Sequence, residues 1–184
     1  MPITKKTLKE GKNEMNILID AGSCRGRFIK KFVLTPMYSL GWEIHAFEPN
    51  PDLVIDCDKA IVHREAAWIR DGKIDFYIGR SIVGSTIIKD KITGRLKDRP
   101  IKVPCIDLGG WIMRTFKPED YIILRMDIEG AEYHVLPQMI ETGAIKYVKE
   151  LYYEPHWDKV GVSKKTNHRL AKALARYVEV YHIL

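Results

Sequence analysis

A short segment near the start of the chain has the residue types of a nucleotide-binding turn. It reads DAGSCRG and contains Asp20, Gly22, Ser23 and Gly26. Glycine lets a backbone approach a ligand closely, and the N–H groups at the start of a following helix favour polar or anionic groups. A tight turn without any ligand has the same composition, so a partner motif is needed before the segment indicates a binding site.

That partner is an acid, Glu48, at the end of the next apolar run. An acid in this position of a Rossmann-like unit accepts hydrogen bonds from the hydroxyls of a ribose. Together with the glycine turn, Glu48 therefore indicates a ribose-bearing cofactor, such as NAD or S-adenosylmethionine. NAD is disfavoured, because Asp20 stands where the G-x-G-x-x-G fingerprint has its first glycine.

A second group of acids follows the buried run YIILRM. Asp127, Glu129 and Glu132 come directly after this run. Charged groups at the end of a core strand are costly unless they have a ligand or a partner, so they indicate a functional pocket. Glu129 and Glu132 could alternatively serve only as favourable charges at the start of a helix.

Glu154 and His156 follow a later run, YVKELYY, and are expected at the same edge. Asp127, Glu129, Glu154 and His156 are therefore the candidate catalytic residues, since each could accept a proton from an acceptor hydroxyl. Asp127, Glu154 and His156 could also converge on a divalent ion, which would lower the pKa of that hydroxyl. Their spacing in the sequence does not show such convergence, so we expect no metal site.

Strand and helix patterns alternate along the chain. This alternation predicts a single α/β domain over residues 1–184, with a mainly parallel central sheet, helices on both faces and ligands at the carboxyl ends of the strands. The expected strands are 16–20, 42–47, 60–65, 121–126, 147–153 and 178–184. The expected helices follow Gly26, open at residues 49–51, and cover 107–116, 129–141 and 163–177.

Two segments do not follow this alternation of strand and helix patterns. Short β-favouring runs at 73–78, 85–88 and 101–106 predict a small antiparallel, β-rich insertion across residues 71–106. Residues 1–15 are polar and lysine-rich and are expected to form an N-terminal extension.

The composition is that of a globular protein, with 46% hydrophobic and 29% charged residues. No apolar stretch is long enough for a membrane helix, so we expect a soluble, cytoplasmic protein without a membrane span. The three cysteines lack metal-binding spacing and are expected to be reduced thiols. The net charge of +6 would favour an anionic partner, but the basic residues are scattered.

Three motifs, taken in order, resemble those of the FkbM-type methyltransferase family. They are IDAGSCRG (residues 19–26), AFEPNP (46–51) and MDIEGAEYHVL (126–136). EAAW (65–68), VPCIDL (103–108) and YYEPHW (152–157) extend the resemblance over roughly residues 17–157. The chain departs from the family at Ser23-Cys24, where an alanine-asparagine turn is usual, and at Arg125, where a lysine is common.

The resemblance implies a Rossmann-like class I methyltransferase fold that binds S-adenosylmethionine. Glu48 would bind the ribose hydroxyls, Glu65 and Ala66 would border the adenine, and Asp127 would face the sulfonium. The implied cofactor-binding residues are Asp20, Gly22, Ser23, Gly26, Glu48, Glu65, Ala66 and Asp127.

The predicted activity is methylation of a hydroxyl on a sugar, a lipid-linked molecule or a natural product. One alternative is methylation of the ribose 2′-hydroxyl of RNA, which the basic balance and the acid at the end of the same strand would also suit. A second alternative is a non-catalytic module that binds the cofactor and serves interaction alone. The acids at Asp20, Glu48, Asp127 and Glu129 disfavour this last reading.

Overall fold

The computed structural model describes residues 14–80, 84–93, 95–97 and 99–183, so the predicted N-terminal extension lies almost entirely outside the described residues. A six-stranded sheet in the order β3-β2-β1-β7-β8-β9 forms its centre, and every neighbouring pair of strands is parallel. The predicted parallel sheet is therefore confirmed. Its strands are Asn16–Ala21 (β1), Glu43–Phe47 (β2), Ile61–His63 (β3), Tyr121–Met126 (β7), Val148–Tyr153 (β8) and Glu179–His182 (β9).

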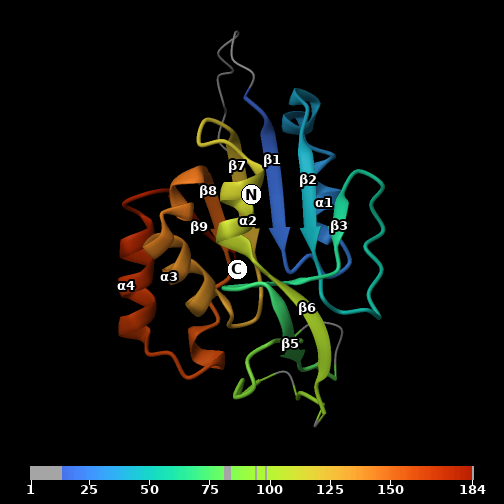
Figure 1. The fold of residues 1–184 in the computed structure, drawn as a ribbon, viewed down its shortest axis with the longest axis vertical. Coiled ribbons are helices and arrows are strands. Elements are labelled where there is room, and N and C mark those ends of the chain that lie inside the picture. Colours follow the sequence, from blue (N-terminus) through green and yellow to red (C-terminus); the bar gives the residue numbers. More distant parts are fainter. Residues whose placement is uncertain (1–13, 81–83, 94, 98, 184) are drawn as a thin grey trace.

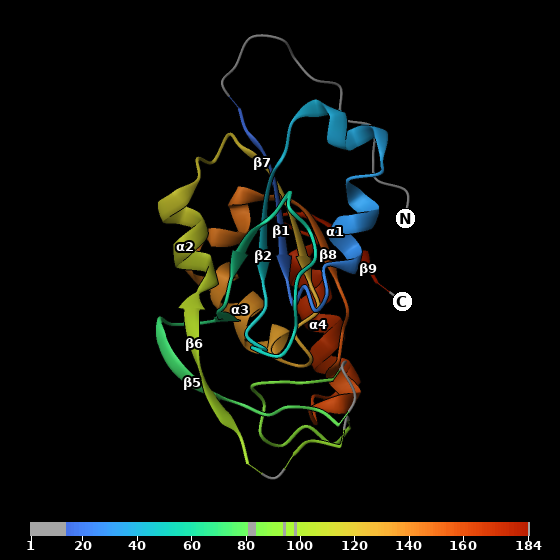
Figure 2. The same cartoon turned by 90° about the vertical axis from the view of Figure 1, so that its right-hand side faces the viewer.

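Helices cover both faces of this sheet, as expected (Figure 2). Side chains alternate along a strand, so Ile17 and Ile19 of β1 pack into the core on one face and Leu18 into the core on the other. The Leu18 face carries α1 (Arg27–Phe32) and the 3₁₀ helix η1 (Pro36–Leu40). The opposite face carries α2 (Leu108–Thr115), α3 (Glu132–Thr142), η2 (Ala144–Tyr147) and α4 (Lys164–Leu174), with η3 (Trp157–Lys159) preceding α4. None of the helices among the described residues is long and apolar enough to cross a bilayer.

A second, three-stranded sheet lies beyond the carboxyl ends of the parallel strands (Figure 1). Its strands are Ala66–Trp68 (β4), Gly72–Phe76 (β5) and Ile101–Asp107 (β6), in the order β4-β6-β5. β5 and β6 form the predicted antiparallel pair, whereas β4 was not predicted and pairs in parallel with β6. This small sheet stands directly over the edge where ligands are expected.

The strand order of the large sheet reverses between β1 and β7. From β1 the chain builds outward through β2 to β3, and it later returns to the other side of β1 to add β7, β8 and β9. Open α/β sheets bind ligands in the crevice outside such a reversal, at the carboxyl ends of the strands. The residues after β1, β2 and β7 are therefore the ones that this topology gathers.

The helix predicted to open at residues 49–51 is wrong. Residues 48–60 contain turns and irregular backbone instead. Pro51 follows Asn50 directly, and a proline disfavours helical backbone in the residue before it. The side chain of Asn50 also accepts the N–H of Asp52 at 3.0 Å and closes a local turn in place of a helical one.

Two further elements differ from the prediction. Residues 85–88 form no strand; they contribute one isolated bridge, between Tyr77 and Thr86. The helix expected over 129–141 begins only at Glu132, because Glu129 and Gly130 have φ angles of 55° and 108° that are incompatible with a right-handed helix. The late start keeps Glu129 in the loop that follows β7.

Candidate active site

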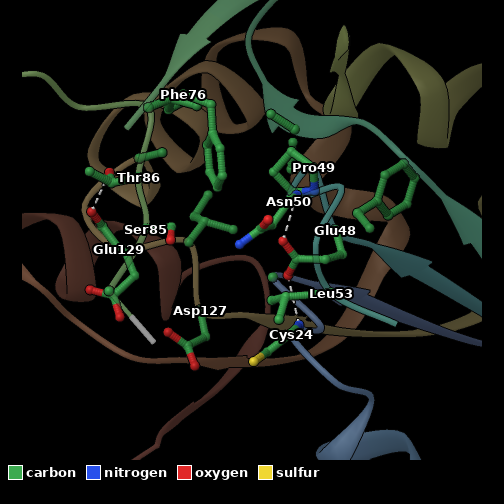
Figure 3. A pocket seen from close by; sticks show the side chains of 18 residues that line it. Cys24, Glu48, Pro49, Asn50, Leu53, Phe76, Ser85, Thr86, Asp127 and Glu129 are labelled. Atoms are coloured by element: carbon green, nitrogen blue, oxygen red, sulfur yellow. Dashed lines mark hydrogen bonds between the residues drawn. The ribbon is translucent and has the colours of Figure 1, made fainter. Parts of the chain in front are cut away.

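A pocket opens at the edge where the two sheets meet. The space between its walls measures about 650 Å³, a volume that includes open solvent. Its walls come from the ends of β1, β2 and β7, from the small sheet and from residues 84–87 (Figure 3). The lining residues are Gly22, Cys24, Phe47, Glu48, Pro49, Asn50, Leu53, Ala66, Ala67, Phe76, Gly84, Ser85, Thr86, Ile87, Asp127, Ile128, Glu129 and Ala131.

The turn after β1 is fixed to both neighbouring strands. Gly22 has a φ of 81°, and a Cβ there would lie 1.9 Å from the carbonyl oxygen of Asp127, so only glycine fits. The Gly22 N–H donates to the carbonyl of Phe47 at 3.0 Å. Cys24, a free thiol, is also left-handed, with a φ of 53°. These restraints hold the backbone of the turn against the pocket.

Glu48 stands directly after β2 and is only 6% exposed. Its Oε2 accepts the N–H of Cys24 at 2.8 Å, and its Oε1 accepts the N–H of Asn50 at 2.9 Å (Figure 3). Burial raises the pKa of Glu48 to about 7, although these two N–H groups and Arg64 favour the charged form. Each carboxylate oxygen has a further lone pair, so Glu48 can still accept hydrogen bonds from the hydroxyls of a ligand.

Arg125 of β7 links the glycine turn to the acid that follows β7. Its Nη1 donates to Oδ1 of Asp20 at 3.1 Å and to the carbonyl of Gly22 at 2.9 Å, and its Nη2 donates to Oδ2 of Asp127 at 2.6 Å. Burial disfavours the charged guanidinium, but the two carboxylates outweigh it and raise the pKa of Arg125. Burial also raises the pKa of Asp20, and Arg125 opposes that shift.

His156 lies behind the acids, with 1% of its side chain exposed. Its Nδ1 and its backbone N–H each lie 2.9 Å from Oε1 of Glu132. The ring is thereby oriented so that Nε2 lies 3.8 Å from Asp127, 3.6 Å from Glu129 and 3.2 Å from Glu154. Burial disfavours the charged imidazole, but Glu132 and Glu129 outweigh it and raise the pKa of His156.

Glu129 is held in its left-handed conformation by the insertion. The hydroxyl of Thr86 donates to the Glu129 carbonyl at 2.8 Å (Figure 3), and Nζ of Lys91 lies 2.6 Å from Oε2 of Glu129. Lys91 also donates to the carbonyl of Gly84 at 2.8 Å. Burial favours the neutral acid, but Lys91 and His156 outweigh it and lower the pKa of Glu129.

The predicted site residues divide into those that line the pocket and those that support it. The lining includes Gly22, Glu48, Ala66, Asp127 and Glu129. The residues outside the lining are Asp20, Ser23, Gly26, Glu65, Glu154 and His156.

Each residue outside the lining has its own place near the pocket. The hydroxyl of Ser23 donates to the Asp20 carbonyl at 2.7 Å, and Gly26 precedes α1. The Glu65 carboxylate lies 3.9 Å from Nδ1 of His63 and is not part of the lining, although the next residue, Ala66, is. Glu154 and His156 lie beside the pocket acids, since Nε2 of His156 is 3.8 Å from Asp127, 3.6 Å from Glu129 and 3.2 Å from Glu154.

Sequence reasoning gave no role to Arg125, Thr86 or Lys91. Arg125 carried a signal, since a permanent cation inside an apolar core strand must have buried partners. Thr86 and Lys91 carried none, because they meet Glu129 across 43 and 38 positions of the sequence.

The family comparison agrees with this geometry. Residues 20–177 match the model of the methyltransferase FkbM domain. The chain belongs to the FkbM methyltransferase family. The resemblance drawn from the motifs is thus confirmed, and the parallel sheet with its covering helices is the Rossmann-like α/β fold expected for such a domain. No curated protein and no solved structure matched this FkbM methyltransferase.

Proposed function

We propose that this FkbM methyltransferase uses S-adenosylmethionine to methylate a hydroxyl on a sugar, a lipid-linked molecule or a natural product. One observation carries the cofactor assignment: the carboxylate of Glu48 is fixed at the pocket wall by two backbone N–H groups, beside the turn of Gly22. An acid held in this way at the end of β2 is suited to the two hydroxyls of a ribose. Membership of the family supports methyl transfer as the reaction.

The rest of the pocket fits the other parts of this cofactor. Leu53, Ala66 and Phe76 supply apolar wall for the adenine, while Glu65, expected there from the resemblance, is not part of the lining. Asp127 also lines the pocket and lies between Glu129 and Cys24 (Figure 3). When bound, S-adenosylmethionine supplies a methyl group on a positively charged sulfur, and the negative charge of Asp127 would favour that end.

Transfer to a hydroxyl breaks the sulfur–carbon bond, forms a carbon–oxygen bond and releases the hydroxyl proton. A nearby base helps, because the proton must leave as the new bond forms. Asp127 and Glu129 both line the pocket and can receive it. Burial raises the pKa of Asp127 in spite of Arg125, which makes this carboxylate the stronger base of the two. Glu154 and His156 act as positioning residues, since they lie behind the lining.

Transfer of a radiolabelled methyl group tests the proposal. The acceptors are glycans, lipid-linked sugars, hydroxyl-bearing natural products and RNA. We expect labelled ether in one of the first three classes, and a loss of at least about a hundredfold in rate for Asp127→Asn. The control is Asp75→Asn, which removes an exposed partner of Lys102 and should leave the rate unchanged. Label only in RNA, no labelled ether, or an Asp127→Asn rate equal to the control would refute the assignment.

A further inference from the structure

We propose that Asp127, Glu129 and His156 form a site for one divalent cation beside the pocket, and that the charge of the adjacent Glu154 strengthens it. The inference deepens the proposed function and rests on it, since the same acids face the acceptor hydroxyl. From the spacing of these residues in the sequence we expected no metal site. What reverses it is that the loop after β7 and the loop after β8 bring ligand atoms of Asp127, Glu129 and His156 within 4.8 Å of one another, and Glu154 lies 3.2 Å from Nε2 of His156.

The buried imidazole is the observation that points to an ion. Glu132 is fully buried and, as a carboxylate, accepts the Nδ1 proton of His156, so a neutral imidazole directs its Nε2 lone pair at the acids. This Nε2 is buried and makes no hydrogen bond within the described part of the chain. Metal-bound histidines usually donate their second ring N–H to a carboxylate, which is the arrangement that Glu132 provides.

The distances suit a shared ion. Nε2 of His156 lies 3.2 Å from Oε1 of Glu154, 3.6 Å from Oε2 of Glu129 and 3.8 Å from Oδ1 of Asp127. Two ligands that each lie about 2.1 Å from one ion are about 3.0 Å apart at a right angle and about 3.4 Å apart in a tetrahedron. The 3.6 Å and 3.8 Å separations from Nε2 to Glu129 and Asp127 are slightly longer than these values, and the three ligand atoms all lie within 4.8 Å of one another.

The acidic side chains around the site outnumber the basic ones, so the site carries a net negative charge. Arg125 pairs with Oδ2 of Asp127, and Lys91 occupies one lone pair of Oε2 of Glu129. Lys159 is farther away, 3.8 Å from Glu154 and 4.0 Å from Glu129. Once the imidazole has given up its proton to bind an ion, three cations face five acids, which leaves two negative charges for a divalent ion to balance. The five acids are Asp20, Asp127, Glu129, Glu132 and Glu154.

The ligand set indicates the type of ion. Carboxylate oxygens suit Mg²⁺ and Mn²⁺, and an imidazole nitrogen shifts the preference toward first-row transition metals, so we take Mn²⁺ as the probe. An ion beside Asp127 and Glu129 would touch the acceptor end of the pocket. A hydroxyl bound to it would lose its proton more readily, because a divalent cation stabilises the alkoxide.

Titration of the chelator-treated full chain with Mn²⁺, with free ion followed by electron paramagnetic resonance, tests the site. We expect one ion per chain and affinity lower by at least about tenfold in Glu154→Gln and in His156→Gln. Glu154 is one-third exposed, so its variant should fold even if the histidine variant does not. The control Glu119→Gln removes an exposed acid elsewhere and should bind like the wild type.

No Mn²⁺ binding by the wild type, or equal affinity in Glu154→Gln and Glu119→Gln, would overturn the site and would indicate a protonated His156 paired with the acids. Calorimetry with S-adenosylmethionine, on the same chelator-treated chain, separates this failure from failure of the proposed function. Cofactor binding without Mn²⁺ binding removes only the metal site. Mn²⁺ binding without cofactor binding removes the proposed function and leaves the metal site.

Discussion

Replacement of Glu48 by glutamine tests how the pocket holds a ribose. In the free protein the pKa of Glu48 is raised to about 7 by burial, so roughly a tenth of the carboxylate is charged at pH 6 and roughly nine-tenths at pH 8. Ribose hydroxyls donate to the charged form, and binding must first remove the proton when it is present. The apparent Kd of wild-type protein for S-adenosylmethionine should therefore fall about tenfold between pH 6 and pH 8.

The glutamine variant has nearly the same shape but no charge to titrate. Loss of two hydrogen bonds to a charged acceptor costs about 3 kcal/mol, or a Kd about a hundredfold higher, and the pH dependence should disappear. Calorimetry at pH 6, 7 and 8 in two buffers of different ionisation enthalpy measures both the Kd and the protons released. A wild-type Kd that is constant over this range, or the same tenfold change in Glu48→Gln, would refute the reasoning.

Three further predictions concern the supports of the pocket. The pKa of Glu48 is raised from 4.5 to about 7 in the folded state, so the folded state binds this proton more tightly than the unfolded chain does. The free energy of unfolding should therefore decrease by roughly 3 kcal/mol as the pH rises from 4.5 to about 7. Urea denaturation checks this, and an unchanged slope in Glu48→Gln would contradict it. Gly22→Ala should destabilise the fold by more than about 3 kcal/mol, because its Cβ would meet the Asp127 carbonyl. The control Gly41→Ala has a similar φ and open space around it, and should cost about 1 kcal/mol. Similar urea midpoints for the two variants would contradict the close packing proposed for the turn at Gly22. Thr86→Val removes the hydroxyl that donates to the Glu129 carbonyl and accepts the N–H of Ile88. We expect kcat to fall and the free energy of unfolding to drop by about 1–3 kcal/mol, while the affinity for the cofactor stays the same. A change confined to the Kd for the cofactor would place Thr86 at the cofactor end of the pocket and contradict this prediction.

Much of the fold was accessible from the sequence because its signals are local. Residues 17–19 and 122–124 are buried on both faces of the sheet and therefore form unbroken apolar runs in the sequence. The start of α4 was readable too, since Ser163 accepts the N–H of Thr166 at 3.1 Å as an N-cap. Glycine and an acid at the ends of the first two strands likewise predicted which edge binds a ligand.

What the sequence missed depends on contacts between distant residues. Asn50 looked like part of a helix start, but its own side chain closes a turn, and the neighbouring Glu48 carboxylate takes its N–H. Glu129 was expected to begin a helix, but the insertion holds it in a left-handed conformation through Thr86 and Lys91. The meeting of His156 with three acids depends on the packing of two loops, which spacing along the chain does not encode.

The cofactor assignment underlies every chemical step proposed for the pocket, so direct binding is its most decisive test. Calorimetric titration of the wild-type chain with S-adenosylmethionine at pH 8 should show one molecule bound per chain. A parallel titration with NAD should show none. Failure to bind S-adenosylmethionine, or equal binding of NAD, would contradict the proposal that Glu48 and the turn at Gly22 hold the ribose of a methyl donor.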